Sequence, residues 1–322
     1  MVRKNKMQNI SHWLVTGGAG FIGSHIVKEL VAQGQKVSVL DNLSGGKLEN
    51  LAPVADKIHF IQGDICDFSD ILDACGGVDY VLHHAALISV AESMEKPQET
   101  GEINVQGTIN VLEAARQSGV KRVVFASSAA VYGTRPELPY KETTPIDCQS
   151  PYAWSKQAGA ELCQLYTKAY GLEAVALRYF NVYGTGQNPN SAYAAVIAKF
   201  MQLAAENKPL GIDWDGLQSR DFVNVKDVVQ ANLLAARKGV AGEIYNVASG
   251  RTHTLLELAD TIEKVSGRKL ERVPRPKRPG DVHESSADIS KIRALGFEPR
   301  VTLEEGLKEM WQEKMAEMKI AA

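Results

Sequence analysis

A glycine-rich turn near the start of the chain constrains the fold more than any other feature. Residues 13–25 read WLVTGGAGFIGSH, in which a short apolar run leads into Gly17, Gly20 and Gly23, spaced by three. Beyond the glycines the apolar residues change from strand-like to helical spacing, which predicts a strand, a tight turn and a helix N-terminus. Glycines let a backbone approach a pyrophosphate, whose charge is met by the free N–H groups and dipole of such a helix. The turn therefore predicts a nucleotide-binding site.

Further apolar runs predict more strands of the same sheet. The runs lie at 36–41, 58–64, 78–83 and 121–126, and a long helix is predicted at 97–118. Strands that alternate with helices of this length form parallel sheets that are covered on both faces. The predicted fold class is therefore α/β, with a Rossmann-type doubly wound parallel sheet. The second strand ends in a carboxylate, which is also typical of dinucleotide-binding folds.

Polar or glycine residues at the ends of these strands mark the predicted ligand-binding edge. Five residues share this position: Gly17, Asp41, Asp64, His84 and Ser127. Ligands in such sheets bind beyond the carboxyl ends of the strands, where the strand order reverses. Asp64 is equally compatible with a turn or helix-capping role. Adjacent His83 and His84 point to opposite faces of a strand and are poorly placed to share a metal, so we expect no metal site.

The pattern of the sequence changes beyond about residue 181. A turn-rich loop at 184–191 precedes a helix at 194–205, and an amphipathic helix at 303–315 closes the chain. We expect a Rossmann domain over residues 1–180. Most of residues 181–322 would form a smaller substrate-binding lobe, interleaved with the last strands of the sheet.

The composition is that of an ordinary soluble protein and argues against several other classes. The 322 residues are 44% hydrophobic and 23% charged, with a formal net charge of −2. This balance gives no reason to expect binding to nucleic acid or to a membrane surface, and the basic segment 268–278 is expected to be solvated. No apolar run approaches the roughly 20 residues of a membrane span. We expect a cytoplasmic protein whose 4 cysteines are reduced.

A tyrosine and a lysine one helical turn apart form the predicted catalytic pair. Tyr152 and Lys156 lie on one face of a predicted helix, and Ser127 and Ser128 end the fifth predicted strand. A free tyrosine has a pKa near ~10 and is no base at neutral pH. A lysine ammonium and an oxidised nicotinamide would lower that pKa, and a serine would share the hydrogen bond to the reacting hydroxyl. The alternative is an amphipathic helix in which the tyrosine and lysine are incidental.

Several motifs together resemble the extended short-chain dehydrogenase/reductase superfamily. They are TGGAGFIG at 16–23, the set Ser128, Tyr152 and Lys156, and LRYFNVYG at 177–184. Two more resemble the nucleotide-sugar 4-epimerases, SRDF at 219–222 and RPGD at 278–281. The segment QNPNSAYAA at 187–195 and Ser285 are similar to UDP-N-acetylglucosamine 4-epimerases. The similarity extends over nearly the whole chain, from His12 to about Glu309.

The resemblance implies an NAD-dependent 4-epimerase of UDP-hexoses, which oxidises carbon 4 of the sugar and reduces it again on the other face. The implied catalytic residues are Ser128, Tyr152 and Lys156. The implied NAD-binding residues are Gly17, Gly20, Phe21, Ile22, Gly23, Asp41, Asn42, Asp64, Ile65, Ala85, Ala86, Asn104, Tyr152, Lys156 and Tyr179. The implied substrate-binding residues are Ser128, Asn181, Gln187, Asn190, Ala195, Arg220, Arg278, Asp281 and Ser285.

The resemblance also implies individual roles. Asp41 would bind the adenosine ribose, and Asp64 with Ile65 the adenine. Arg220 and Arg278 would clamp the diphosphate, because guanidinium groups bind phosphate oxygens bidentately. The small side chain of Ser285 would leave room for an N-acetyl group, so the expected substrates are UDP-GlcNAc and UDP-GalNAc as well as UDP-Glc and UDP-Gal. Relatives pair through two long helices, so we also expect a homodimer.

Other functions of the same fold are alternatives. A nucleotide-sugar dehydratase needs an acid and a base after the serine, where this chain has Ala129 and Ala130. An NADPH-dependent reductase is disfavoured by Asp41, whose charge would repel a 2′-phosphate. A non-catalytic NAD-binding regulator is another alternative. Such proteins commonly lose the tyrosine or the lysine, whereas this chain has both Tyr152 and Lys156. An epimerase of UDP-uronic acids is a further alternative.

Overall fold

Seven parallel strands form the central sheet of the computed structural model, which describes residues 10–189, 196–277 and 283–321. Their order is β3-β2-β1-β4-β5-β6-β10. The strands are β1 (His12–Thr16), β2 (Lys36–Asp41), β3 (Ile58–Gln62), β4 (Tyr80–His83), β5 (Arg122–Ser128), β6 (Glu173–Tyr179) and β10 (Ile244–Val247). The order reverses between β1 and β4, so ligands are expected beyond the carboxyl ends of these two strands. The predicted doubly wound fold is confirmed.

Helices cover both faces of this sheet. One layer contains α1 (Phe21–Ala32), α8 (Val225–Lys238) and the 3₁₀ helix η1 (Leu48–Lys57), and the other contains α2 (Phe68–Ala74), α5 (Gly107–Gln117) and α6 (Pro151–Tyr170). Adjacent residues of a strand feed the two layers, because Leu14 packs in one hydrophobic core and Val15 in the other. Because these strands are buried on both faces, their sequences are nearly continuous apolar runs.

The long helix predicted at 97–118 contains a π-helical turn. It comprises α4 (Pro97–Gly101), the π-helical turn η2 (Glu102–Gln106) and α5, and follows the short helix α3 (Val90–Glu95). Single π-helical turns often occur at functional sites. This one contains Asn104, which is buried.

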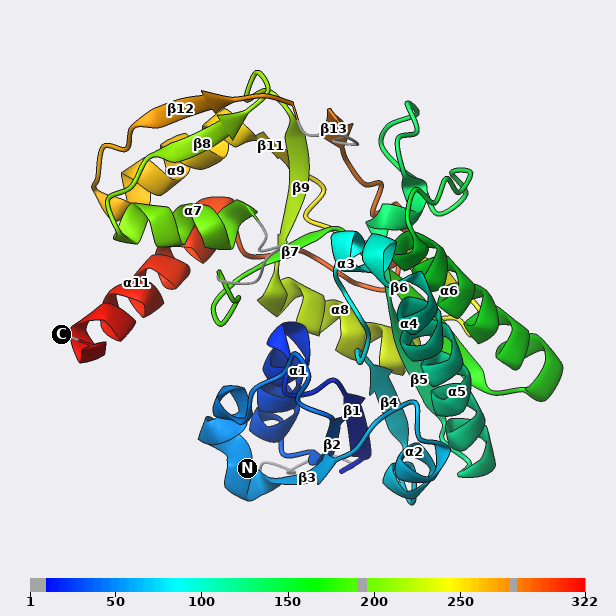
Figure 1. The fold of residues 1–322 in the computed structure, drawn as a ribbon. Coiled ribbons are helices and arrows are strands. Elements are labelled where there is room, and N and C mark those ends of the chain that lie inside the picture. The colour runs from blue at the N-terminus through cyan, green and yellow to red at the C-terminus, as the bar shows by residue number, and fades with distance from the viewer. Residues whose placement is uncertain (1–9, 190–195, 278–282, 322) are drawn as a thin grey trace, which may run out of the picture.

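A second group of elements forms the smaller lobe seen at the upper left of Figure 1. Strands β7 (Asn181–Tyr183), β9 (Ser219–Asn224), β11 (Thr252–Thr254) and β13 (Glu284–Ser285) form one sheet, and β8 (Leu210–Asp213) pairs with β12 (Arg272–Arg275). Helices α7 (Val196–Ala205), α9 (Leu255–Ser266) and α11 (Leu303–Ala321) share a third hydrophobic core with them. The short elements η3 (Ala129–Tyr132) and α10 (Ser290–Arg293) complete the fold. Within the described residues, no helix is both long and apolar enough to cross a membrane.

Candidate active site at the carboxyl ends of the strands

The glycine turn after β1 meets the loop after β4. Gly17 has a left-handed φ of 68°, and a Cβ at this position would lie 2.7 Å from the backbone nitrogen of Ala85. A Cβ on Gly23 would lie 2.2 Å from the carbonyl oxygen of Gly17. Only glycine permits these approaches. Helix α1 begins after Gly20, which has no side chain to cap the helix. The first turn of α1 contains no carboxylate.

This uncapped helix N-terminus fits an anionic group. Phe21 and Ile22 are the first residues of α1 and, with Gly23, carry N–H groups that precede the regular helical bonds. The helix dipole favours negative charge at the same place. The turn therefore fits the pyrophosphate of the predicted dinucleotide.

Asp41 ends β2 and is already bonded to the backbone. One of its carboxylate oxygens accepts a hydrogen bond from the Ala19 N–H at 2.9 Å, and the other accepts one from the Leu43 N–H at 2.8 Å. An ionised carboxylate has about four acceptor sites. Asp41 can therefore brace the glycine turn and still accept hydrogen bonds from a ligand.

Asn42 and Asp64 are brought together across β2 and β3. The Asn42 amide donates to Asp64 at 2.8 Å, and the Cys66 N–H donates to the other oxygen of Asp64 at 2.8 Å. Burial opposes ionisation of Asp64, but these hydrogen bonds outweigh it and lower the pKa. The turn role considered for Asp64 is thus present. Ile65 is buried beside it, and its carbonyl accepts from the Asn110 amide at 2.9 Å.

His83 is held by two threonines inside the fold. Thr16 Oγ1 accepts hydrogen bonds from the N–H groups of His84 at 3.2 Å and Ala85 at 3.3 Å. Its own hydroxyl can therefore donate to His83 Nδ1 at 2.8 Å. Thr108 donates to the Asn104 carbonyl at 2.6 Å and so accepts from His83 Nε2 at 3.1 Å. This network selects the neutral Nε2–H tautomer, and burial keeps the pKa of His83 well below its usual value.

Asn104 binds the loop after β4 to helix α6. Its amide oxygen accepts from the Leu87 N–H at 2.8 Å, and its amide nitrogen donates to the Leu87 carbonyl and to Ser155 Oγ, both at 2.9 Å. The side chain thus makes three bonds within the chain. The loop that it fixes contains Ala85 and Ala86, which were predicted to contact the cofactor.

His84 and Tyr179 form a second chain of hydrogen bonds. The Asn232 amide nitrogen donates to the Val228 carbonyl at 2.8 Å, so its oxygen accepts from the Tyr179 hydroxyl at 2.9 Å. The Tyr179 oxygen then accepts from His84 Nε2 at 3.1 Å. Burial lowers the pKa of His84 to about 4, so the ring is neutral at pH 7. Sequence reasoning did not find Asn232, because nothing in its spacing relates it to Tyr179.

The predicted catalytic residues converge from β5 and α6. Ser128 ends β5, and Tyr152 lies in the first turn of α6 with Lys156 one turn further on. Ser128 lies close enough to Tyr152 to lower its pKa, and Ser128 Oγ accepts a hydrogen bond from the Ala130 N–H at 3.2 Å. Helix α6 lies close to β5 because Gly159 has no side chain, and a Cβ there would lie 2.3 Å from the Phe125 ring.

Lys156 is buried against the strand that carries Ser128. The lysine is 4% exposed, and its Nζ donates to the Ala126 carbonyl at 3.0 Å. Nζ lies 5.9 Å from the centroid of the Tyr152 ring. Burial lowers the pKa of Lys156 to about 8. The site therefore contains a desolvated ammonium beside a phenol.

Lys156 alone does not bring the pKa of Tyr152 below its usual value. Burial raises the pKa of Tyr152, and Ser128 only partly opposes this effect. Lys156 bonds to a carbonyl of β5 instead of the phenol oxygen, so its charge does not overcome burial. A further positive charge is needed to bring the phenol towards neutrality.

Three of the predicted substrate residues, Asn181, Arg220 and Ser285, lie on the smaller sheet. Asn181 begins β7 and donates to the Asp221 carbonyl at 3.1 Å. Arg220 and Ser285 are paired in the ladder between β9 and β13. Gln187 donates to the Val182 carbonyl at 3.1 Å, while its amide oxygen is buried without a hydrogen-bond partner among the described residues. The predictions for Asn190, Ala195, Arg278 and Asp281 lie outside the described residues.

No cluster of three or more potential metal-binding side chains occurs within residues 10–189, 196–277 and 283–321.

Comparisons with known proteins agree with this geometry. The model of the NAD dependent epimerase/dehydratase family matches residues 13–248. A putative UDP-glucose 4-epimerase of Methanocaldococcus jannaschii is 43% identical over 298 residues, which cover 92% of this chain and 95% of that protein.

Two solved structures are also similar. UDP-N-acetylglucosamine 4-epimerase from Methanobrevibacter ruminantium, in complex with UDP-N-acetylmuramic acid, has a TM-score of 0.93 at 38% identity, covering 97% of this chain and 100% of that one. The UDP-glucose 4-epimerase of Thermus thermophilus, in complex with NAD, has a TM-score of 0.86 at 39% identity, covering 94% of this chain and 99% of that one. The chain is therefore an NAD-dependent enzyme of the epimerase/dehydratase family and belongs with its nucleotide-sugar 4-epimerases.

Proposed function

We propose that the chain interconverts the carbon-4 epimers of UDP-hexoses, both UDP-GlcNAc with UDP-GalNAc and UDP-Glc with UDP-Gal. The observation that carries this proposal is the convergence of Ser128 at the end of β5 with Tyr152 in the first turn of α6, with buried Lys156 one turn away. The pair lies at the same edge of the sheet as the glycine turn. A group that moves a proton is thus near the place that fits a dinucleotide.

The residues at the switch point would hold NAD. Gly17, Gly20 and Gly23, together with the first N–H groups of α1, suit its pyrophosphate, and Asp41 suits the adenosine ribose. When bound, NAD supplies the oxidant and the reductant for hydride transfer at carbon 4 of the sugar. Asn42, Asp64, Ile65, Ala86 and Tyr179 would line the rest of this site, with Asn104 supporting its wall.

Tyr152 would accept the proton of the 4-hydroxyl and later return it. Burial disfavours the phenolate, so positive charge is needed to lower the pKa of Tyr152. The ammonium of Lys156 supplies one such charge, and an oxidised nicotinamide ring would supply another. Ser128 would share the hydrogen bond to the hydroxyl and so orient it towards Tyr152. Both roles require Ser128 and Tyr152 to be held at a fixed distance from each other.

The smaller lobe, within 181–322, would bind the UDP part of the substrate. Arg220 and Arg278 would bind the diphosphate, and Asn181 would contact the phosphates. Gln187, Asn190, Ala195 and Asp281 would surround the sugar. The ladder partner of Arg220 is Ser285, which supports a position for Ser285 near the phosphate-linked hexose.

Ser285 would set the choice of sugar. A serine leaves space for the acetamide group, whereas a bulky aromatic ring would fill that space as the sugar turns over. Ser285→Tyr should abolish conversion of UDP-GlcNAc and spare that of UDP-galactose, while Ser285→Ala should convert both. The measurement is separation of the products after incubation with four UDP-sugars and no added cofactor. Conversion of UDP-galactose without any conversion of UDP-GlcNAc by the unmutated protein would contradict this assignment.

The same assay separates an epimerase from a dehydratase. The family description covers both activities. Dehydration across carbons 5 and 6 needs an acid and a base next to the serine, and Ala129 and Ala130 begin η3 there without an ionisable group. We therefore expect epimers and no keto-deoxy sugar among the products.

We also propose a homodimer formed through α6 and the helix of α4, η2 and α5. Trp154, Leu165 and Tyr170 of α6 are 57%, 52% and 58% exposed, which is unusual for large apolar side chains on one helix. Leu112 of α5 lies in the core and is not available for this contact. Light scattering at micromolar concentration should give the mass of a dimer, and a monomer would contradict this proposal.

A further inference from the structure

Arg178 is a buried arginine on β6 that is bonded to neutral oxygens. It is 2% exposed, and its guanidinium donates to Tyr132 Oη at 2.9 Å, Gln157 Oε1 at 3.0 Å and the Glu142 carbonyl at 3.3 Å. Its Nε is buried without a partner among the described residues. Arg178 makes no ion pair within the part of the chain that the structure describes. A buried cation without an ion pair is costly, and apolar residues of similar volume often stabilise a fold more. Stability alone is therefore a poor explanation for this side chain.

Two of the three partners of Arg178 belong to the elements next to Ser128 and Tyr152. Tyr132 ends η3, whose N-cap is Ser128 itself. Gln157 directly follows Lys156 in α6. One planar guanidinium thus bonds to both elements, and its fork fixes direction as well as distance.

Tyr132 is itself held firmly, so it can transmit this constraint. Its hydroxyl donates to Asn246 Oδ1 at 2.7 Å, and its ring stacks on Tyr140 at a centroid distance of 4.8 Å. The Arg178 guanidinium lies 5.0 Å from the centroid of the Tyr132 ring. The Asn246 amide also donates to the Tyr140 carbonyl at 2.9 Å. The segment after Ser128 is therefore anchored on several sides.

We propose that Arg178 is a positioning residue that keeps Ser128 on β5 within hydrogen-bonding reach of Tyr152 on α6. It acts through Tyr132 and Gln157 and does not touch the sugar. The inference rests on the proposed function, in which Ser128 and Tyr152 act together on the 4-hydroxyl. Loss of the fork would let η3 and α6 move apart, and a displacement of about 1 Å in a reacting pair can cost about 100-fold in rate.

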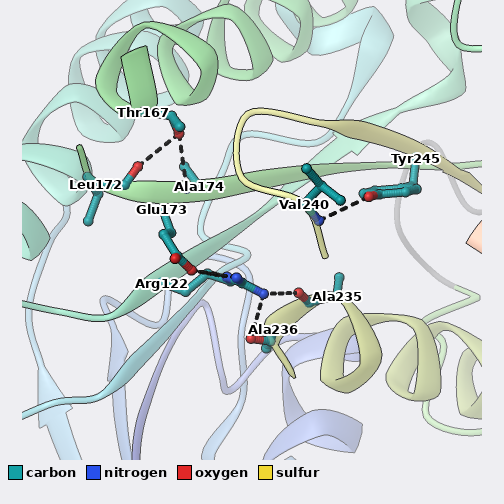
Figure 2. Close-up of polar contacts among 9 residues, drawn as sticks. All are labelled: Arg122, Thr167, Leu172, Glu173, Ala174, Ala235, Ala236, Val240 and Tyr245. Atoms are coloured by element: carbon teal, nitrogen blue, oxygen red, sulfur yellow. Dashed lines mark hydrogen bonds and ion pairs between the residues drawn. The ribbon is translucent and has the colours of Figure 1, made fainter. Parts of the chain in front are cut away.

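Arg122 provides a matched control at the other end of the same strands. It begins β5, whereas Ser128 ends it. Figure 2 shows its guanidinium bonded to Glu173 of β6 and to the carbonyls of Ala235 at 3.0 Å and Ala236 at 3.1 Å. Arg122 thus joins two strands and a helix, much as Arg178 joins β6 to η3 and α6, but it does so at the opposite end of β5 from Ser128. Removing it should cost stability and leave the geometry of Ser128 and Tyr152 unchanged.

The test compares Arg178→Met, Arg178→Lys and Arg122→Met in the full chain. For each variant we would measure the melting temperature, NAD per chain, and kcat and KM for UDP-galactose. Arg178→Met should lower kcat about 30- to 100-fold, with KM changed less than about threefold and NAD retained. Arg178→Lys keeps the charge but not the fork, so it should not restore kcat. Arg122→Met should keep kcat within about twofold of the value of the unmutated protein.

A second readout does not depend on turnover. Phenolate absorbance during a pH titration, with Tyr152→Phe in the same background subtracted, reports the pKa of Tyr152. Loss of the contact with Ser128, which lowers that pKa, should shift the titration of Arg178→Met to higher pH. The Arg122→Met titration should match that of the unmutated protein.

Several results would overturn the inference. They are an unchanged kcat and titration in Arg178→Met, restoration of both by Arg178→Lys, or an equal loss of kcat in Arg122→Met. If Arg178→Met does not fold, Gln157→Met removes only the acceptor on α6 and should shift kcat and the titration in the same directions; no shift would also overturn it. If the unmutated protein converts no UDP-sugar, the proposed function fails, and the titration still decides the role of Arg178.

Discussion

The two ends of the central sheet use similar polar residues in opposite ways. At the amino ends of β5, β6 and β10, the polar groups drawn in Figure 2 are bonded to one another. Thr167 donates to the Leu172 carbonyl at 2.8 Å and accepts from the Ala174 N–H at 3.1 Å, and Tyr245 accepts from the Val240 N–H at 3.1 Å.

At the carboxyl ends of the strands, polar groups keep hydrogen-bonding capacity that the described residues do not use. The N-terminus of α1 has no side-chain cap, and Lys156 is buried with a single carbonyl as its acceptor within the described residues. Burial shifts the pKa values of Lys156 and His84 downwards and that of Tyr152 upwards. Perturbed titratable groups are typical of functional sites. The comparison teaches that one end stabilises the fold and the other keeps its groups available for a ligand.

Tyrosines from the two ends should give the largest contrast. Tyr152→Phe keeps the ring but removes the proton acceptor, so activity should fall about 10²–10⁴-fold with nearly unchanged stability. Tyr245→Phe leaves the Val240 N–H without its acceptor and should cost about 1 kcal/mol of unfolding free energy with activity unchanged. Steady-state kinetics and urea unfolding check both variants. A loss below about tenfold in Tyr152→Phe would mean that another residue is the base.

Glycines with positive φ should give the next largest contrast. Gly17→Ala would place a Cβ 2.7 Å from the backbone nitrogen of Ala85, so we expect loss of NAD and a destabilisation above about 3 kcal/mol. Gly171 follows α6 with φ 74° and has open space around it, so Gly171→Ala should cost only about 1–2 kcal/mol. NAD retained after desalting and urea unfolding are the measurements. An equal loss of unfolding free energy in Gly17→Ala and Gly171→Ala would contradict the difference between the two ends of the sheet.

Cations from the two ends should change stability with opposite signs. Burial lowers the pKa of Lys156 from 10.5 to about 8, which corresponds to a cost on the order of 3 kcal/mol at pH 7. Lys156→Met should therefore abolish activity while raising the unfolding free energy by about 1–3 kcal/mol. Arg122→Met should lower it by about 1–3 kcal/mol, because Glu173 and the carbonyls at the end of α8 lose their donor.

The pH dependence of Lys156→Met sharpens this test. Between pH 8 and 10.5 the unfolded chain binds the Lys156 proton and the folded chain releases it, so this residue makes stability rise with pH. The difference in unfolding free energy between Lys156→Met and the unmutated protein should therefore shrink from pH 8 to pH 10.5. A constant difference would show that Lys156 carries no shifted pKa.

The sequence predicted the positions of the site residues better than their bonds. The strand at 36–41 and the glycine turn were predicted closely, because apolar runs and glycine spacing are local signals. The site then followed from the rule that ligands bind at the carboxyl ends of parallel strands. Strand β6 was not predicted as a strand, although the motif at 177–184 overlaps its end.

Long-range bonds gave no signal in the sequence. Arg178 is 46 residues from Tyr132 and 21 from Gln157, and no spacing rule connects them. The bonds that Asp41 makes to Ala19 and Leu43 depend on how the turn folds back over β2. The burial of Tyr152 and the acceptor that Lys156 bonds to are likewise set by packing, so the spacing of the two residues alone could not give them.

The fate of the hydrogen on carbon 4 tests the central claim most directly. The purified protein would be incubated with UDP-galactose in D₂O without added cofactor, and the products analysed by proton NMR. An internal transfer predicts UDP-glucose that retains the original hydrogen at carbon 4, with no stoichiometric need for NAD(P)H. Deuterium at carbon 4, or conversion only when NAD(P)H is supplied and consumed, would contradict the account.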